Sequence, residues 1–333
     1  MRKRHSYIYF AAAALMLTTT SCERTQDSQP MWSINYQPVL GGMESADTRG
    51  TLYNPTNTST IALSTTGISS FTVFGYKGST MFTNTGGETV GYTSSWTPGT
   101  GGHTEVEPEK DTYTFLAYAN GNDNVSSLSS TYEKISFSYD MKKSGYDILD
   151  ATRQKDVLLG YFSKEIKSGP IEAGILFKHP LTSVIFRLGI INGDYEKDDI
   201  TRIEIRGVHT SGTATLTSGG TVSWTSLSPA PAETPAYLTD VTYCNKPSSG
   251  DFADSDYVIG EPFILLPQDL SKYPVKIRLC NNNDYTSYKE ATLSTGSWEP
   301  GKTYIYSLTG SEGMTVYLDA AEWIPGGGDA TFK

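Results

Sequence analysis

The sequence predicts an all-β protein built from two β-sandwich domains in tandem. Three observations favour this class: 22 tyrosines among many Ser and Thr residues, 32 glycines and 16 prolines that divide the chain into short pieces, and the absence of a long run with apolar residues at helical spacing. About seven short strands are expected in each half, and strands of this kind bury their apolar faces by packing sheet on sheet. The only helix that we expect is a turn or two near residues 146–153.

Individual strands are predicted from alternating apolar and polar residues. The clearest is residues 135–139, where Ile135, Phe137 and Tyr139 alternate with serines. A polar connector at residues 192–199 divides the chain into a first domain, 50–189, and a second domain, 190–333. We expect the run Phe177 to Leu188 to close the first domain. The other predicted strands are 71–76, 113–118, 157–161, 202–206, 214–216, 221–224, 237–243, 263–266, 275–279 and 304–308.

The chain begins with an export signal. Arg2, Lys3 and Arg4 precede an apolar segment, Tyr7 to Leu17, that is too short to cross a bilayer as a helix. Small residues then lead to Cys22, which indicates a lipoprotein box in which the thiol is acylated and becomes the mature N-terminus. We therefore interpret residues 1–21 as a signal peptide. Thr19 stands where the usual box has Leu, so ordinary cleavage that leaves Cys22 as a free thiol is the alternative.

Charge excludes nucleic acid as a partner. The formal net charge is −10, and it becomes −13 once the three basic residues of the leader are removed. Phosphate contacts need a basic patch, which an acidic exported chain does not supply. No later stretch is long and apolar enough to span a membrane, so the only membrane contact implied is through the lipid.

Residues 22–49 combine a tether, a strand and a cleavage site. Trp32, Ile34 and Tyr36 fall on one side of an extended chain, which predicts a half-buried strand that Pro38 ends. A small, polar connection follows, and Arg49 is its only basic residue, so a trypsin-like protease can enter there and leave Gly50 as the new N-terminus. We interpret 22–49 as a propeptide with a removable first strand. In the alternative, this strand is permanent and Arg49 is an ordinary loop residue.

The chain also ends with a strand-like run. Met314, Val316, Leu318 and Ala320 lie on one face, with polar or aromatic residues between them. This segment can fold back on residues 304–308 as a hairpin, or leave its own domain and pair with another molecule as a donor strand.

Catalysis and metal binding are not expected. Three histidines of the exported chain, His103, His179 and His209, lie in separate segments without a partner at metal-ligand spacing. We interpret His179 as a hydrogen-bonded structural residue. The acidic stretches 103–109 and 251–256 are interpreted as solvated loops rather than cation sites, and no cofactor is expected. Cys244 and Cys280 either pair as a disulfide or remain buried thiols; these two residues lie in strand-like sequence.

Five motifs can be taken together: the lipoprotein leader, Thr48-Arg-Gly50, Phe177-Lys-His-Pro-Leu181, Trp298-Glu-Pro-Gly-Lys-Thr-Tyr304 and the terminal strand ending at Trp323. In this order and spacing they resemble the fimbrillins, the pilins of type V fimbriae. The resemblance implies two transthyretin-like Greek-key β-sandwich domains and export as a lipoprotein to the outer membrane, where the protein is surface-exposed in a fimbrium.

The resemblance also implies partners. An arginine-specific protease would remove the first strand, and the C-terminal strand of another fimbrial subunit would fill the vacated groove. A chain with both strands fits a shaft or tip subunit better than an anchor, which keeps its tether. The alternative is a non-polymerising outer-membrane lipoprotein that binds a glycan or a protein on a host or bacterial surface. Its stacking faces would come from tyrosines and from Trp96, Trp224, Trp298 and Trp323.

Overall fold

The computed structural model confirms the all-β class. The described residues are 30–41, 61–65, 67–121, 124–141, 156–188, 200–228, 235–237, 258–281, 284–309 and 315–318. Within these ranges strands dominate, and one 3-10 turn, η1 (Leu63–Thr65), is the only helical piece. None of the described helices is long and apolar enough to cross a membrane. The helix expected near residues 146–153, Cys244 and the acidic stretch 251–256 lie outside the described residues.

The first half of the chain forms one twelve-stranded sheet that folds around its own core. Its order is β13-β1-β7-β6-β4-β9-β12-β14-β2-β3, with β5 paired to β4 and β8 paired to β1. The bounds are β1 (Trp32–Tyr36), β2 (Val39–Leu40), β3 (Ile61–Ala62), β4 (Ser70–Lys77), β5 (Thr80–Met81), β6 (Glu88–Tyr92), β7 (Trp96–Pro98), β8 (Glu105–Val106), β9 (Asp111–Ala119), β12 (Leu158–Ile166), β13 (Ile171–Ala173) and β14 (Leu176–Lys178).

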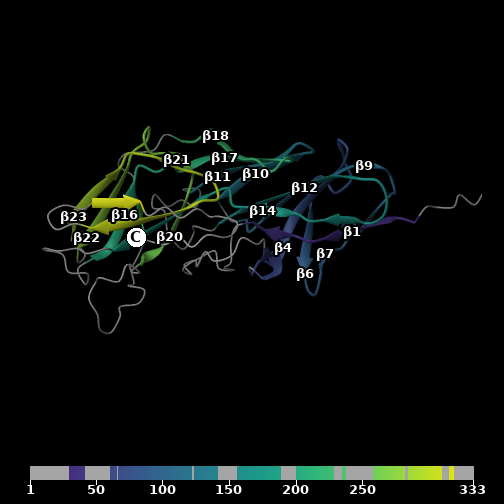
Figure 1. Cartoon of the computed structure of the whole chain (residues 1–333), viewed down its shortest axis with the longest axis horizontal. Coiled ribbons are helices and arrows are strands. Elements are labelled where there is room, and N and C mark those ends of the chain that lie inside the picture. The colour runs from purple at the N-terminus through teal and green to yellow at the C-terminus, as the bar shows by residue number, and fades with distance from the viewer. Residues whose placement is uncertain are drawn as a thin grey trace, which may run out of the picture.

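A second sheet joins the two halves. The hairpin β10 (Val125–Thr131) and β11 (Lys134–Asp140) pairs with β17 (Ser211–Thr217), which pairs in turn with β18 (Val222–Thr225). The β11–β17 ladder is continuous from Lys134 opposite Thr217 to Asp140 opposite Ser211. Figure 1 shows these strands between the purple and blue strands of the first half and the green and yellow strands of the second half.

The remaining described strands form three smaller sheets. One has the order β20-β15-β25-β26, another β19-β16-β22-β23, and the third pairs β21 with β24. The bounds are β15 (Thr182–Leu188), β16 (Ile200–Arg206), β19 (Pro235–Tyr237), β20 (Val258–Leu265), β21 (Gln268–Asp269), β22 (Val275–Asn281), β23 (Asp284–Leu293), β24 (Ser297–Trp298), β25 (Thr303–Thr309) and β26 (Thr315–Leu318).

One expectation about the strands is wrong. We expected the run ending at Leu188 to close the first domain, but β15 is parallel to β25 and antiparallel to β20, both in the second half. Alternation predicts that a run is a strand and which side chains share a face, but it carries no information on the strand's neighbours. The division between residues 189 and 190, and the transthyretin-like arrangement of each half, stay predictions.

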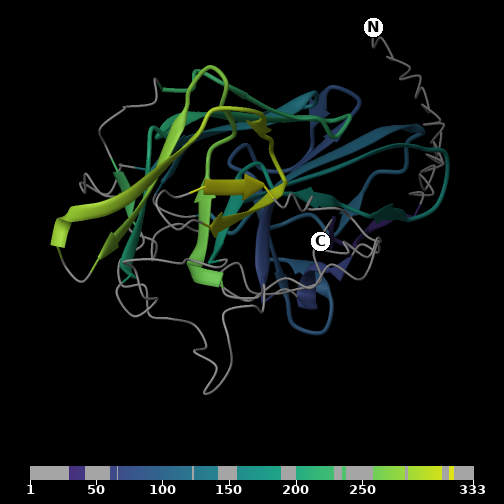
Figure 2. The same cartoon turned by 60° about the vertical axis from the view of Figure 1, so that its left-hand side comes forward.

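Strands β4, β9 and β12 each contribute buried side chains to two different cores. Figure 2 shows the purple and blue strands of the first half on the right and the green and yellow strands of the second half on the left. In β9, Tyr113, Phe115 and Ala117 face a core that contains β1 and β2. Leu116 faces the other way, into a larger core that includes the hairpin β10–β11 and the second half. Strands that bury both faces have near-continuous apolar sequences, as β9 does. The core that contains β1 and β2, called the groove core below, is where the functional argument is made.

Candidate functional site

Residues 32–41 are an internal part of the first sheet, with paired neighbours along both edges. β1 lies parallel to β13, with Ile34 opposite Ile171, and β2 continues beside β14 in the same direction, with Val39 opposite Leu176. The other edge of β1 pairs with β7 and β8, and the other edge of β2 pairs with β3. The segment therefore completes the sheet, and both of its backbone edges are hydrogen-bonded within it.

The backbone hydrogen bonds alternate between these two edges. Odd-numbered residues donate toward β13 and β14, whereas Ile34 donates to the carbonyl of Thr104 at 2.8 Å, on the opposite edge. On that edge the Pro38 carbonyl accepts from Leu63 at 3.1 Å. The donations toward β13 and β14 run from Gln37 to Ala173 (3.0 Å), from Val39 to Ile175 (2.9 Å) and from Gly41 to Phe177 (3.0 Å).

The prediction that the strand ends at Pro38 is confirmed, but the chain stays in the sheet after it. β1 does end at Tyr36, but β2 resumes at Val39 and stays beside β14. A proline inside a strand usually removes a ladder hydrogen bond. Pro38 lies between two residues that donate toward β13 and β14, so its missing N–H falls on the other edge and the parallel ladder is kept. The chain therefore continues beyond Pro38 as a second short strand, β2, which was not expected.

The inward face of the segment fills the groove core. Ile34, Tyr36, Pro38 and Leu40 are buried, as the period of two requires, and Trp32 is half-buried. The Tyr36 ring meets Phe71 and Phe115 edge-on, with ring centroids 6.2 and 5.8 Å apart. Burying a large apolar side chain contributes roughly 1.5 to 3 kcal/mol, so Ile34, Tyr36 and Leu40 together contribute about 5 to 9 kcal/mol.

The outward face carries a polar contact that marks the register. Asn35 lies opposite Glu172 in the parallel ladder, and its side-chain amide donates to the Glu172 carboxylate at 2.7 Å. The Gln37 amide donates to the other oxygen of the same carboxylate at 2.6 Å. A shift by two residues would leave one of these amides without the carboxylate, so the pair favours the observed alignment.

Electrostatics keep the centre of the groove core neutral. Burial raises the pKa of Tyr36 above its ordinary value of 10.0, and the negative charge of Glu88 acts in the same direction. The Tyr36 hydroxyl is buried and has no hydrogen-bond partner among the described residues. Tyr36 therefore stays protonated at neutral pH and packs as an aromatic side chain.

The predicted donor strand is in place as a hairpin. β26 pairs antiparallel with β25, with Val316 opposite Leu308 and Leu318 opposite Tyr306. Within the described residues β26 has no partner on its other side, because the sheet order ends there. Of the two arrangements left open by the sequence, this structure has the folded-back one. Met314 and Ala320 lie outside the described residues, as do Cys22, Arg49 and Gly50.

The other candidate residues have structural roles. The His103 ring and backbone N–H bind the buried Glu88 carboxylate, at 2.5 and 2.7 Å. Glu109 pairs with Lys77. Across the part of the chain that the structure describes, no three His, Cys, Asp or Glu residues gather at metal-binding distance. His179 is buried against Asp156, which confirms its interpretation as a hydrogen-bonded structural residue.

Three of the four candidate tryptophans pack inside the protein. Trp298 is buried and donates to the Tyr306 hydroxyl at 2.8 Å, and the half-buried Trp224 donates to the Pro180 carbonyl at 2.6 Å. Trp96 packs on Phe71, with centroids 5.2 Å apart. Trp323 lies outside the described residues.

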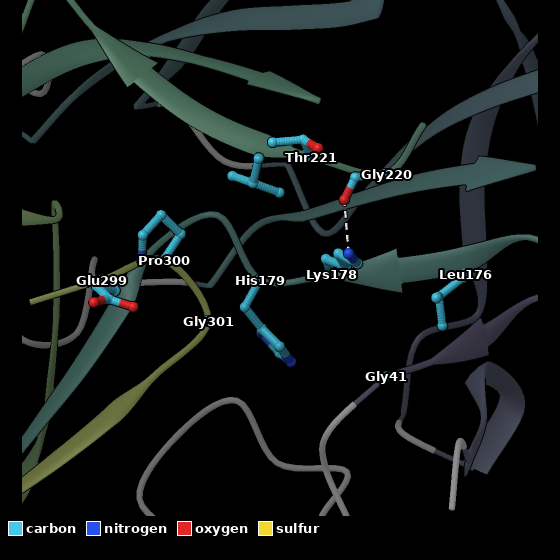
Figure 3. A pocket seen from close by; sticks show the side chains of 10 residues that line it. Gly41, Leu176, Lys178, His179, Gly220, Thr221, Glu299, Pro300 and Gly301 are labelled. Atoms are coloured by element: carbon cyan, nitrogen blue, oxygen red, sulfur yellow. Dashed lines mark hydrogen bonds between the residues drawn. The ribbon is translucent and has the colours of Figure 1, made fainter. Parts of the chain in front are cut away.

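A pocket of about 660 Å³ opens where the segment 32–41 ends. In Figure 3, Gly41, Leu176 and Lys178 lie on one side of the pocket, Glu299 and Pro300 lie on the other, and Thr221 lies above. Lys178 donates to the Gly220 carbonyl at 2.6 Å across the pocket. The sequence gives no sign of this pocket, because its walls come from four separate segments of the chain.

Comparisons with known proteins agree with this architecture. The sequence matches the Fimbrillin-like family over residues 56–322. The fold is similar to the crystal structure of a candidate cell adhesion protein from Bacteroides uniformis, with a TM-score of 0.51 and 13% identity over 88% of this chain and 99% of that one. It is also similar to the crystal structure of a candidate cell adhesion protein from Bacteroides ovatus, with a TM-score of 0.51 and 15% identity over 87% of this chain and 96% of that one. A search of curated proteins gives no match.

The fold and the matched family define an adhesive or fimbrial protein of the cell surface. The chain belongs to the fimbrillin-like family, because the family match covers well over half of it. The family indicates a structural protein, one that assembles with other fimbrial subunits.

Proposed function

We propose that this chain is a fimbrial subunit that polymerises by strand exchange after proteolysis. The precursor is acylated at Cys22, held at the outer membrane and cut after Arg49, so that residues 22–49 leave. A neighbour's C-terminal strand then enters the groove. The observation that carries the proposal is the internal position of residues 32–41, which are hydrogen-bonded along both edges and bury one whole face.

Removing this segment creates an adhesive groove. Two strand edges lose their partners at once, and unpaired edges recruit other strands. The groove core is also opened where Ile34, Tyr36 and Leu40 were buried. An extended segment with apolar residues at every second position satisfies both requirements, by adding main-chain hydrogen bonds and filling the side-chain sites. While it is in place, the propeptide strand prevents this exchange.

The C-terminal strand can serve as the donor because it is attached along one edge. β26 loses only its short ladder to β25 when it leaves, whereas it gains two neighbours in the groove. The segment supplies four apolar residues in alternation: Met314, Val316, Leu318 and Ala320. They match in number the four buried positions of the propeptide strand, residues 34, 36, 38 and 40, which are called sites 34, 36, 38 and 40 once the propeptide has left. The donor and the groove are different surfaces of the same chain, so the contact is heterologous and can build an open filament.

The test is assembly after controlled cleavage. The full chain is treated with an arginine-specific protease and run on a non-reducing gel, and its N-terminus is sequenced. A ladder of subunits that begin at Gly50 is the expected result. Arg49→Lys is the matched control, since it keeps the positive charge but is not cut by such a protease, and it should stay monomeric.

A second pair of variants tests the donor strand. Val316→Asp places a charge on the face proposed to enter the groove and should abolish the ladder. Tyr317→Asp places the same charge on the other face and should allow assembly. A single shortened monomer that binds a polysaccharide or a surface protein would contradict strand exchange and identify a non-polymerising surface lipoprotein.

A further inference from the structure

The pocket at the end of residues 32–41 is continuous with the groove. Gly41 lies in its wall, and among the described residues its N–H makes the last hydrogen bond of the parallel ladder, to Phe177. Leu176 belongs both to the pocket and to β14, the strand that holds β2. If residues 22–49 leave, Gly41 leaves with them, and groove and pocket become a single channel. A donor strand that fills the groove can then continue directly into the pocket.

In the proposed arrangement the donor runs in the same direction as the strand that it replaces. A donor that runs parallel to β13 and β14, as β1 and β2 do, receives the same carbonyl acceptors at Ala173, Ile175 and Phe177. Aligning the four apolar donor residues with the four buried sites puts Met314 at site 34 and Ala320 at site 40. Asn35 is then replaced by Thr315, whose hydroxyl can donate to Glu172 as the amide does.

The space around Gly41 supports this register. A Cβ atom at Gly41 would lie 3.2 Å from Cδ1 of Leu176, so only a small residue fits there after a slight shift of that side chain. In the proposed alignment site 41 receives Ala321, which carries only a Cβ. A shift by two residues would put Asp319 or Trp323 there instead. The side chains of Asp319 and Trp323 are larger than that of Ala321, and either would come too close to the Leu176 side chain.

From this alignment we infer that the pocket binds the side chain of Trp323 from a neighbouring copy of this chain. Trp323 comes two residues after Ala321, and each residue of extended chain advances roughly 3.3 Å, so it reaches beyond site 41 into the pocket. The inference rests on the proposed strand exchange and adds an anchor beyond the four groove sites.

The pocket has room for an indole ring, and its walls offer that ring both apolar and polar contacts. Its volume of about 660 Å³ is within the range of roughly 300 to 1,000 Å³ of small-molecule sites. Leu176, Val222 and Pro300 supply apolar wall. The Lys178 ammonium lies over the Tyr161 ring, 5.4 Å from its centroid, so one cation–π contact is already present beside the pocket. The Glu299 carboxylate, which pairs with Lys302 at 2.7 Å, supplies an acceptor for the indole N–H at the rim. Aromatic anchors of this kind dominate binding energy at interfaces.

Site-directed cross-linking tests the contact directly. A benzoylphenylalanine is placed at position 323 of the full chain, which is then cleaved with the arginine-specific protease, allowed to assemble and irradiated. Cross-links to peptides that contain Leu176, Val222 or Pro300 of another copy are expected. If strand exchange occurs but the cross-links fall outside the pocket, this inference is wrong while the proposed function stands. If no ladder forms at all, both are wrong.

Substitutions give an independent readout. Trp323→Ala polymers should dissociate in urea at least about tenfold faster than wild type, because the anchor is lost. Glu322→Ala changes the adjacent residue and should dissociate at the wild-type rate. Thr221→Trp fills the pocket from its exposed rim, without changing the donor, and should reproduce the effect of Trp323→Ala. Equal dissociation rates for wild type, Trp323→Ala and Thr221→Trp would overturn the inference.

Discussion

Replacing Tyr36 tests how firmly the propeptide strand closes the groove. The ring is 5% exposed and lies between Phe71 and Phe115, whereas its hydroxyl is buried without a partner among the described residues. The ring and the hydroxyl therefore have opposite effects on stability. Tyr36→Ala removes both groups, and Tyr36→Phe removes only the hydroxyl.

The magnitudes follow from burial. Truncating a buried aromatic residue to Ala costs about 3 to 5 kcal/mol, through the lost transfer free energy and the cavity that remains. Leaving a hydroxyl buried and unpaired costs roughly 1 to 3 kcal/mol. Tyr36→Ala should therefore lower the free energy of unfolding of the uncleaved chain by about 3 to 5 kcal/mol, while Tyr36→Phe should leave it unchanged or raise it by about 1 kcal/mol.

Two measurements on the uncleaved chain check this prediction. Urea denaturation gives the free energy of unfolding, and hydrogen exchange of the Val39 and Gly41 amides reports the closure of the groove. In Tyr36→Ala both amides should exchange faster, because the strand that carries them is less firmly packed. If the free energy of unfolding of Tyr36→Ala lies within about 0.5 kcal/mol of wild type, the packing of β1 in the groove core is refuted. Unchanged exchange rates of the two amides would refute it as well.

Three other predictions test the surrounding structure. Glu172→Ala removes the acceptor of Asn35 and Gln37 on an exposed face, so the stability of the uncleaved chain should fall by only about 1 kcal/mol or less in urea denaturation; a larger loss would show that the contact is not merely a register marker. Partial burial raises the pKa of Glu290, but hydrogen bonds from Arg278 and Lys276 outweigh it and hold that pKa below its ordinary 4.5. Because the folded-state pKa is the lower one, this stabilisation is present above the unfolded-state pKa and is lost as the pH falls, so Glu290→Gln should flatten the decline in thermal stability between about pH 5 and pH 3, and an unchanged decline would contradict the assignment. Gly207 has a φ of +84°, and a Cβ there would lie 2.7 Å from the Pro274 carbonyl oxygen, so Gly207→Ala should lower stability by roughly 2 kcal/mol or more; Gly91→Ala, whose Cβ would meet nothing closer than 4.0 Å, is the control and should be nearly neutral in the same urea titration.

The sequence predicts the local part of this structure well. The side chains of Trp32, Ile34 and Tyr36 share a face because strand geometry alone dictates it, and the most regular alternation, at residues 135–139, lies in β11 as expected. β2 was missed because proline normally argues against a strand. The exception at Pro38 depends on which edge its missing N–H faces, and that is fixed only when β13, β14 and β3 are in place.

The sequence does not predict which strands pair when they lie far apart in the chain. β1 is held by β13, about 140 residues away, and β15 by strands of the second half, and no local pattern selects among strands of similar composition. The same limit applies to the pocket, whose walls meet only through these pairings. The Glu172 contact was also missed, since an exposed Glu gives no signal until the strand opposite it is known.

The most direct test of the account is the mass of the assembled subunit. Native mass spectrometry of the protease-treated chain should give multiples of the fragment 50–333, with the peptide that ends at Arg49 absent from every assembled species. Assemblies that retain this peptide, or that form equally well from the Arg49→Lys chain, would show that the groove is never vacated.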